Sequence, residues 1–244
     1  MAINPAKAQE ATATPVELSP VDSIHLPDLF VSFLSQEPDP HSSLEAVRRE
    51  GEEWFAKLFN LTDAERIKHL RLDYPYSASI WAQSASEADF RTVADWDSWA
   101  MFDDDSSNRD RDYAVKEAKV VMDIMEGIHD HKKDAEEPAT ISALRYMLRD
   151  VWERIVKGST PATHQRIKSA VGYYCQGAIS LAKLQPGEAE NDLQQLIKLR
   201  RRSIGAAPRL PLAEFALKIR LPDKFFQSQV AQRLQDSVCD LVFL

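Results

Sequence analysis

The sequence predicts an all-α protein built as a bundle of helices. Helix-forming residues predominate, 44% of the 244 residues are hydrophobic, and only seven are glycine. Apolar side chains recur at the three- to four-residue spacing of an amphipathic helix through most of the chain. Short links that contain Pro or Gly separate these segments, and strands have little support. Many helices joined by short links are typical of a helical bundle.

The N-terminal region differs from the rest of the chain in composition. Residues 1–22 are rich in Ala, Thr, Pro and Glu, which predicts a disordered tail. Residues 24–33, followed by the proline-rich stretch 37–41, are expected to form an extended arm that packs on the domain. The rest of the chain is long enough to form one large hydrophobic core. We therefore expect a single domain over residues 23–244.

Helices are expected from residue 44 onward. Leu44, Val47 and Leu58 mark the apolar face of the first helix. The stretch 62–65 opens a second helix, and Pro75 restarts the chain. Helix-period apolar residues, with Pro or Gly in the links between most of them, predict further helices over residues 76–83, 88–105, 112–128, 138–157, 162–184, 190–203, 210–219 and 228–244.

Histidines and one charged run are interpreted as surface features. The run over residues 129–137 is most simply a solvated loop, with metal binding as the less favoured alternative. The six histidines, such as His69 and His164, are expected on the surface or in loops and without a catalytic role.

Composition also excludes several classes of function. The net charge of −8 argues against a protein that binds the phosphate backbone of nucleic acids. Cys175 and Cys239 lie within apolar helical patterns and are expected to be buried free thiols. No apolar stretch is long enough to span a membrane, so we expect a cytoplasmic protein. The sequence indicates no oligomeric state.

The most informative feature is an aromatic stretch that leads into three consecutive aspartates. At helical spacing, Trp96 and Trp99 share a face that leads to Asp103, with Asp104 and Asp105 beside it. Three carboxylates at a helix C-terminus repel one another and oppose the helix dipole, so they favour a hard cation such as Mg²⁺. Aromatic faces beside them suit a cation released in a dry pocket. The alternative is that the tryptophans belong to an ordinary core and the acids form an exposed helix end.

A second element contains three arginines at the end of a helix. Arg200, Arg201 and Arg202 precede Gly205, and guanidinium groups bind diphosphate in a bidentate manner. The simpler explanation is that these cations stabilise the C-terminal end of the helix dipole. A helix that is broken at Gly205 also leaves backbone amides and carbonyls available to a ligand.

With these elements, the chain resembles the class I terpene synthases, and more closely the fungal sesquiterpene cyclases of the presilphiperfolanol synthase type. The matching stretches agree in order and spacing over residues 24–244. They are IHLPDLF at 24–30, ASIWA at 78–82, residues 95–105, VWERI at 151–155, LRRRSIGAAP at 199–208 and EFAL at 214–217. The resemblance implies the class I terpenoid synthase α-helical bundle.

The resemblance also implies roles for individual residues. Asp103 and Asp104 match the acids that bind Mg²⁺ in this family. Ser107 occupies the place of the last acid, so Asp105 is either a displaced third carboxylate or only an added charge. Arg201 matches the arginine that senses diphosphate, with Arg200 as its neighbour. Ile204 and Gly205 match the positions whose backbone helps to ionise the substrate. The resemblance implies Trp81, Trp96, Trp99 and Phe102 as the residues that shape the substrate pocket.

The family's second metal motif is absent from the sequence. An Asn/Ser/Glu triad and a later Arg-Tyr pair would follow Leu244 in the family. The resemblance therefore implies a terpene synthase domain that is incomplete at its C-terminus and lacks its last helices, either as a fragment or as a shortened gene product.

Two functions follow as hypotheses. The first is a sesquiterpene synthase in which Mg²⁺ assists the ionisation and cyclisation of farnesyl diphosphate with release of diphosphate. The second is a truncated, catalytically impaired or inactive helical protein related to terpene cyclases. A chain-elongating prenyltransferase is a weaker third hypothesis, because such enzymes carry two aspartate-rich motifs.

Overall fold

The computed structural model describes residue 31 and residues 35–107, 111–183 and 193–243. Within these ranges, the side chains are described except at residues 103–107, 111, 193, 242 and 243. The chain divides into two compact units, Met1–Pro38 and Asp39–Leu244. The expected tail and residues 24–30, 32 and 33 of the expected arm lie outside the described residues, whereas the proline-rich stretch 37–41 is described and contains no helix or strand.

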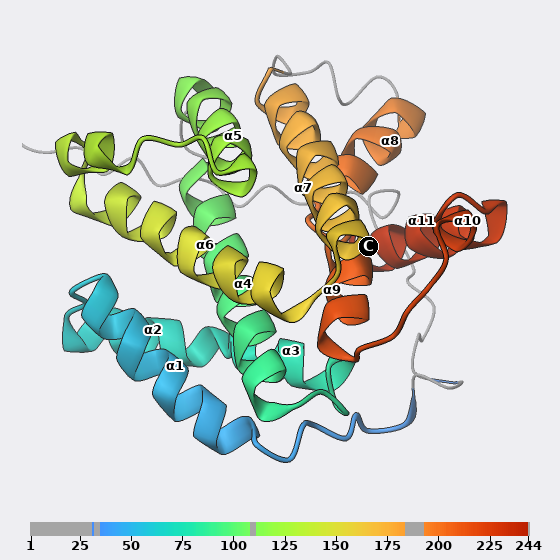
Figure 1. Ribbon diagram of the computed structural model, residues 1–244, viewed down its shortest axis with the longest axis horizontal. Coiled ribbons are helices and arrows are strands. Elements are labelled where there is room, and N and C mark those ends of the chain that lie inside the picture. The colour runs from blue at the N-terminus through green and yellow to red at the C-terminus, as the bar shows by residue number, and fades with distance from the viewer. Residues whose placement is uncertain (1–30, 32–34, 108–110, 184–192, 244) are drawn as a thin grey trace, which may run out of the picture. The chain divides into compact units, whose positions relative to one another are not determined.

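The described part of the second unit is helical and contains no strand, which confirms the all-α prediction (Figure 1). Its elements, in chain order, are α1 (Leu44–Leu58), α2 (Asp63–Leu72), α3 (Tyr74–Trp81), α4 (Glu87–Ser107), α5 (Arg111–Glu126), the 3-10 helix η3 (His131–Glu136), α6 (Ala139–Gly158), α7 (Pro161–Ala182), α8 (Leu193–Ser203), α9 (Arg209–Ala216), α10 (Asp223–Phe226) and α11 (Gln229–Phe243).

Helix α4 lies at the centre of this unit. It packs against α1, α3, α5, α6 and α9, and its side chains Phe90 and Val93 are fully buried (Figure 1). Helix α7 is a second centre of packing, because it contacts α5, α6, α8 and α9. Helix α11 packs on α8 and α10. The aromatic stretch that leads into the three aspartates lies on α4, and the three arginines lie on the arginine-rich helix α8.

The helix boundaries follow from local signals in the sequence. The hydroxyl of Thr62 caps α2 by accepting a hydrogen bond from the backbone N–H of Glu65, whose carboxylate accepts one from the backbone of Thr62 in return. Pro75 lies in the first turn of α3, where a missing N–H costs nothing. The side chain of Thr160 caps α7 directly before Pro161.

Two expectations about polar residues are wrong. The run over residues 129–137 is not a plain solvated loop, because it contains η3 and a buried carboxylate on Asp134. His69 is not a surface residue but is 6% exposed, and its Nδ1 lies 2.8 Å from Oε1 of Glu52 on α1. Its ring stacks on Phe55 with centroids 3.9 Å apart. In both cases a partner elsewhere in the chain makes burial of the polar group possible.

Two other expectations are confirmed. Cys175 and Cys239 are both buried and free. Among the described residues, the helices are too short or too polar to cross a bilayer.

Candidate functional site

One uninterrupted helix carries both the tryptophans and the acidic run. The backbone of α4 extends to Ser107 and therefore includes Asp103, Asp104 and Asp105, whose side chains lie outside the described part of the structure. Seven residues make close to two helical turns, so Trp96 lies on the same face of the helix as Asp103. The acidic end of α4 therefore follows Trp96 by two turns on the same face of the helix.

Trp96 and Trp99 form one wall of a small cavity. Their rings meet edge to face, with centroids 5.1 Å apart and planes at 61°. The cavity has a volume of about 40 Å³. It is lined by Trp96, Asp97, Trp99, Ala100, Met101, Val171, Tyr174, Ile204, Gly205, Pro208 and Arg209. The fold therefore brings Trp96 and Trp99 of α4 to the chain break at Gly205.

A second cavity adjoins the first. It has a volume of about 20 Å³ and is lined by residues of α4, α5 and α7, including Val121 and Cys175. Trp99 and Tyr174 line both cavities. The two cavities therefore share two side chains and lie between α4, α5, α7 and the α8–α9 link.

Asp97 is a cavity residue that the sequence reading missed. Its carboxylate is 3.5 Å from Nη2 of Arg209 and accepts a hydrogen bond of 3.4 Å from the indole N–H of Trp81. Burial raises the pKa of Asp97, and the positive charge of Arg209 opposes that shift. Trp81 does not line the cavity and reaches it only through this hydrogen bond. The signal available in the sequence was an acid between two tryptophans of one helix, Trp96 and Trp99.

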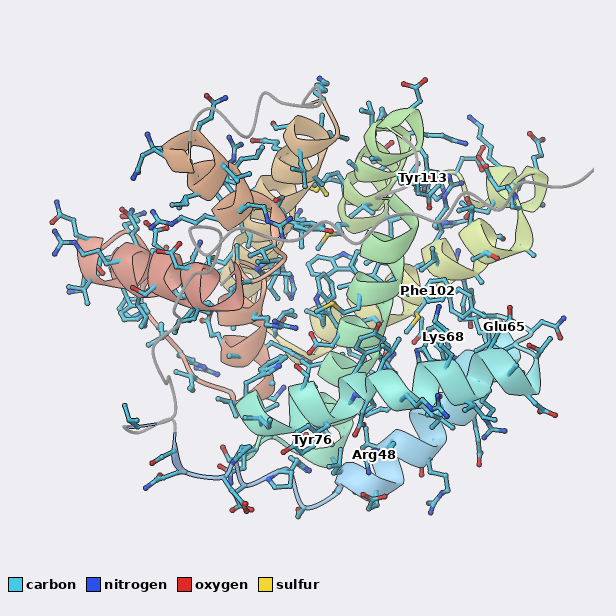
Figure 2. All side chains as sticks on the ribbon, turned by 180° about the vertical axis from the view of Figure 1, so that it is seen from behind. Arg48, Glu65, Lys68, Tyr76, Phe102 and Tyr113 are labelled. Atoms are coloured by element: carbon cyan, nitrogen blue, oxygen red, sulfur yellow. The ribbon has the colours of Figure 1, made fainter. Side chains whose placement is uncertain are left out.

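Phe102 lies away from this cavity. Its ring is 5.5 Å from that of Phe55 and 4.9 Å from that of Phe59, measured between centroids. Both partners belong to α1 or its C-terminal end (Phe102 is labelled in Figure 2). Phe102 thus belongs to the packing between α4 and α1, so the cavity does not contain all four predicted aromatic residues.

The predicted break at Gly205 is present. Helix α8 ends at Ser203, and the N–H of Ile204 still donates to the carbonyl of Arg200 at 3.0 Å. Gly205 then adopts a φ of +74°, a left-handed conformation that only glycine adopts without strain. Because this residue lines the cavity, the turn presents its backbone to the space beside the tryptophans.

Arg201 is paired with acids of α11. Its Nε and Nη2 donate to the two carboxylate oxygens of Asp240, both at 2.6 Å, and Nη1 donates to Asp236 at 3.2 Å. The hydrogen bond with Asp240 raises the pKa of Arg201. Arg201 is therefore engaged by a carboxylate in the bidentate geometry that a diphosphate would otherwise use.

The neighbouring Arg202 turns toward α7. Its Nη2 donates to Oε1 of Gln176 at 3.0 Å, and its guanidinium lies 4.9 Å from the ring centroid of Tyr173. This contact explains one of the three arginines as part of the α7–α8 packing, and leaves Arg200 and Arg201 as the predicted ligands of diphosphate.

Gly177 determines how closely α8 approaches α7. A Cβ atom at this position would lie 2.6 Å from the backbone carbonyl carbon of Arg202, which is closer than real Cβ contacts. We expect Gly177→Ala to lower the free energy of unfolding by about 1–3 kcal/mol, because one of the helices must shift. Urea unfolding followed by circular dichroism measures this loss.

Gly172 on the same helix provides the matched control. A Cβ there would meet Met122 at 3.6 Å, an ordinary contact, so Gly172→Ala is expected to be neutral or stabilising by up to about 1 kcal/mol. Equal effects of the two substitutions would show that close helix approach is not the cause.

A larger cavity lies elsewhere in the unit. It has a volume of about 550 Å³ and is lined by residues of α7, α9, α10 and α11, including Arg166, Tyr173 and Phe226. The guanidinium of Arg166 is already paired with Glu214 and Asp223. This cavity contains none of the predicted pocket residues, so size alone does not identify the site. The smaller cavity, with its indoles and chain break, is the better candidate.

Comparison with known proteins agrees with this geometry. Residues 95–244 match the family described as terpene synthase family 2, C-terminal metal binding. This match covers more than half of the chain and includes α4 from Asp95 onward, the residues that line the cavity and the arginine-rich helix α8. The chain belongs to this terpene synthase family.

Individual relatives share most of this chain. Silphinene synthase peniA of Penicillium patulum is 31% identical over 229 residues, which cover 91% of this chain and 61% of the relative. A protein of Gibberella fujikuroi named inactive (1R,4R,5S)-(-)-guaia-6,10(14)-diene synthase is 27% identical over 90% of this chain and 58% of its own length. The chain thus spans about three fifths of the length of these relatives.

A solved structure shows the same fold. The crystal structure of α-eudesmol synthase matches 84% of this chain and 67% of its own with a TM-score of 0.68 at 18% identity. The described helices therefore form the class I terpene synthase bundle.

Proposed function

We propose that this protein is a sesquiterpene synthase, which ionises and cyclises farnesyl diphosphate with the help of Mg²⁺ and releases diphosphate. The observation that carries the proposal is the cavity in which Trp96 and Trp99 lie with Gly205, on the helix whose end carries the acids. Membership in the terpene synthase family supports the class of reaction.

The acidic end of α4 fits a hard divalent ion. Asp103, Asp104 and Asp105 offer carboxylate oxygens, which are the ligands that Mg²⁺ prefers. The last turn of α4 contains no basic residue, so the helix itself does not neutralise these charges. When bound, Mg²⁺ would stabilise the negative charge that develops on the departing diphosphate.

The chain's own residues account for the remaining steps. Arg200 and Arg201 bind the diphosphate while the allylic carbon–oxygen bond breaks, and both bonding electrons leave with the diphosphate. The indole faces of Trp96 and Trp99 stabilise the allylic cation, and the apolar walls exclude water that would quench it. The departing diphosphate accepts the final proton, so no histidine is needed as a base.

Substrate binding requires the cavity to expand. Its volume of about 40 Å³ is far below the roughly 300–1,000 Å³ of ordinary ligand pockets. Tyr174 and Trp99 line both this cavity and the second one of about 20 Å³, so we expect both side chains to move when substrate binds. We infer that the described conformation precedes substrate binding.

Arg201 must exchange Asp240 for diphosphate if it is the sensor. Asp240→Asn removes the competing negative charge, so we expect the affinity for diphosphate with Mg²⁺ to rise about two- to fivefold. This equals the 0.5–1 kcal/mol that a partly exposed ion pair contributes. Isothermal titration calorimetry measures the affinity, with Asp236→Asn, which removes the longer contact, as the milder companion. An unchanged affinity in Asp240→Asn would argue against the sensor role of Arg201.

The substrate's chain length, the presilphiperfolanol type of product and a cytoplasmic location remain part of this proposal. The second candidate is a non-catalytic relative of terpene cyclases. It is favoured by the carboxylate that occupies Arg201 and by the existence of a relative named as inactive.

Product analysis separates the two candidates. The purified chain is incubated with Mg²⁺ and, in parallel, with geranyl, farnesyl or geranylgeranyl diphosphate, and the extracts are analysed by gas chromatography with mass spectrometry. We expect a C15 hydrocarbon or alcohol from farnesyl diphosphate only. A folded chain that gives no product from any substrate, at any concentration, would support the non-catalytic candidate.

A further inference from the structure

The link between α5 and α6 brings three metal-ligating side chains together. His129, His131 and Asp134 each offer a ligand atom, and these atoms lie within 4.8 Å of one another. None of the three residues lines the cavity beside Trp96, so this cluster is separate from the proposed catalytic site. The mechanism above uses none of them.

The backbone of this link is held in place. After α5, Gly127 adopts a φ of +73°, and the N–H groups of Ile128 and His129 both donate to the carbonyl of Asp123, at 2.9 and 3.2 Å. The side chain of Asp130 caps η3 by accepting from the N–H of Lys132 at 3.2 Å. The histidines are therefore presented by an ordered turn and a short helix.

Two contacts of the cluster, each to a different oxygen of Asp134, lie on either side of the spacing in a coordination sphere. Nε2 of His129 is 2.9 Å from Oδ1 of Asp134, and Nδ1 of His131 is 3.9 Å from Oδ2 of the same carboxylate. Bonds of about 2.0–2.1 Å in tetrahedral geometry place ligand atoms about 3.3 Å apart, between these two values. A separation of 3.9 Å is too long for a hydrogen bond, so Nδ1 of His131 and Oδ2 of Asp134 are not hydrogen-bonded to each other.

The carboxylate is oriented by an arginine behind it. Nη1 of Arg145 donates to Oδ1 of Asp134 at 2.8 Å, and the same guanidinium makes a two-point contact with Glu117. The side chains of Arg145 and Glu117 are 4% and 6% exposed. A hydrogen-bonded partner that fixes a ligating carboxylate is typical of protein metal sites. Because Glu117 offsets the charge of Arg145, the guanidinium does not leave an unbalanced cation beside the cluster.

The donor atoms of this cluster indicate which kind of ion it would prefer. A neutral imidazole has a lone pair for a metal ion. Two imidazoles and one carboxylate form a donor set that prefers a borderline ion such as Zn²⁺ to Mg²⁺.

We propose that His129, His131 and Asp134 bind one transition-metal ion of the Zn²⁺ class, with water as its fourth ligand. The ion would connect the turn after α5 with η3 and, through Arg145, with α6. Its role is structural, because it holds the α5–α6 link in one conformation.

Calorimetric titration with Zn²⁺ in the presence of excess Mg²⁺ tests this proposal. The excess Mg²⁺ occupies hard carboxylate sites, and a variant with Asp103→Asn and Asp104→Asn removes the acidic motif as a competing ligand. We expect one equivalent of Zn²⁺ to bind to the wild type and to this variant alike. Co²⁺ in place of Zn²⁺ should give the visible absorption of a four-coordinate site.

His131→Ala is the decisive variant. The side chain of His131 is 45% exposed, so its loss leaves the fold intact, which the melting temperature verifies. We expect the affinity for Zn²⁺ to fall at least about tenfold. Lys133→Ala is the matched control, since it changes an exposed side chain of the same short helix and should bind Zn²⁺ as the wild type does.

Three results would overturn the proposal. The first is a wild type that binds no Zn²⁺ in excess Mg²⁺. The second is unchanged affinity in His131→Ala. The third is loss of binding in the Asp103→Asn, Asp104→Asn variant, which would place the ion on the acidic motif of α4.

Discussion

Replacement of both Asp103 and Asp104 by asparagine is expected to abolish Mg²⁺-dependent turnover of farnesyl diphosphate. Loss of metal ligands removes several kcal/mol of transition-state stabilisation, so the rate should fall at least about a thousandfold. The melting temperature should stay the same or rise, because the substitutions relieve repulsion among adjacent carboxylates at the C-terminal end of α4. Product formation by gas chromatography and thermal unfolding by circular dichroism measure the two effects.

The matched control for this variant is Asp63→Asn at the exposed start of α2, which should leave turnover unchanged. If the double variant instead unfolds, the aspartates are structural and the assignment of the metal site is wrong. If it turns over at the wild-type rate, the ion that assists the reaction is held elsewhere.

Arg145→Met is expected to cause the largest loss of stability. Arg145 is buried between Glu117 and Asp134, and its hydrogen bonds with them raise its pKa although burial opposes this. Removal of the guanidinium leaves two carboxylates without their cation, and breaking a buried ion pair in this way costs about 3–5 kcal/mol. Urea unfolding at neutral pH measures the change in the free energy of unfolding.

Arg149→Met on the same helix is the control for Arg145→Met. Arg149 lies one turn further along α6 with its guanidinium 5.2 Å from the ring centroid of Tyr146. Its replacement should cost less than about 1 kcal/mol. Similar losses in the two variants would mean that burial of the charge network does not control stability.

Local signals in the sequence were sufficient to predict the helices. Thr62, Pro75 and Gly205 mark helix ends by chemistry that acts over a few residues, and the structure places ends at or next to them. The short helices η3 and α10 were not expected, because elements of six and four residues are too short to show a helical period.

Pairs that are distant in the sequence were beyond prediction. His69 is buried because Glu52 lies opposite it on another helix, and Asp97 is buried opposite Arg209. Arg201 meets Asp240 in the same way. Each of these residues is of a type that is usually exposed, and only the tertiary fold brings its partner close enough to permit burial or pairing.

The sequence predicted the candidate site only in part, because it did not show which face of α4 lines the cavity. Helices α1, α3, α5, α6 and α9 all pack against α4, so apolar residues are needed on most sides of this helix. The spacing of Trp96 and Trp99 placed them on a common face, but it could not show that Phe102 packs on α1. For a helix buried on most sides, periodicity does not identify the face that lines the cavity.

The proposed function requires that the acidic end of α4, through Mg²⁺, and the arginines of α8 bind the same diphosphate. A calorimetric double-mutant cycle tests it directly, with inorganic diphosphate and Mg²⁺ as ligands and Asp103→Asn, Arg201→Gln and their combination as variants. We predict binding that requires Mg²⁺, weakening by each single change, and a loss in the double variant smaller than the sum. Binding that is independent of Mg²⁺, or equal in the wild type and Arg201→Gln, would contradict the claim.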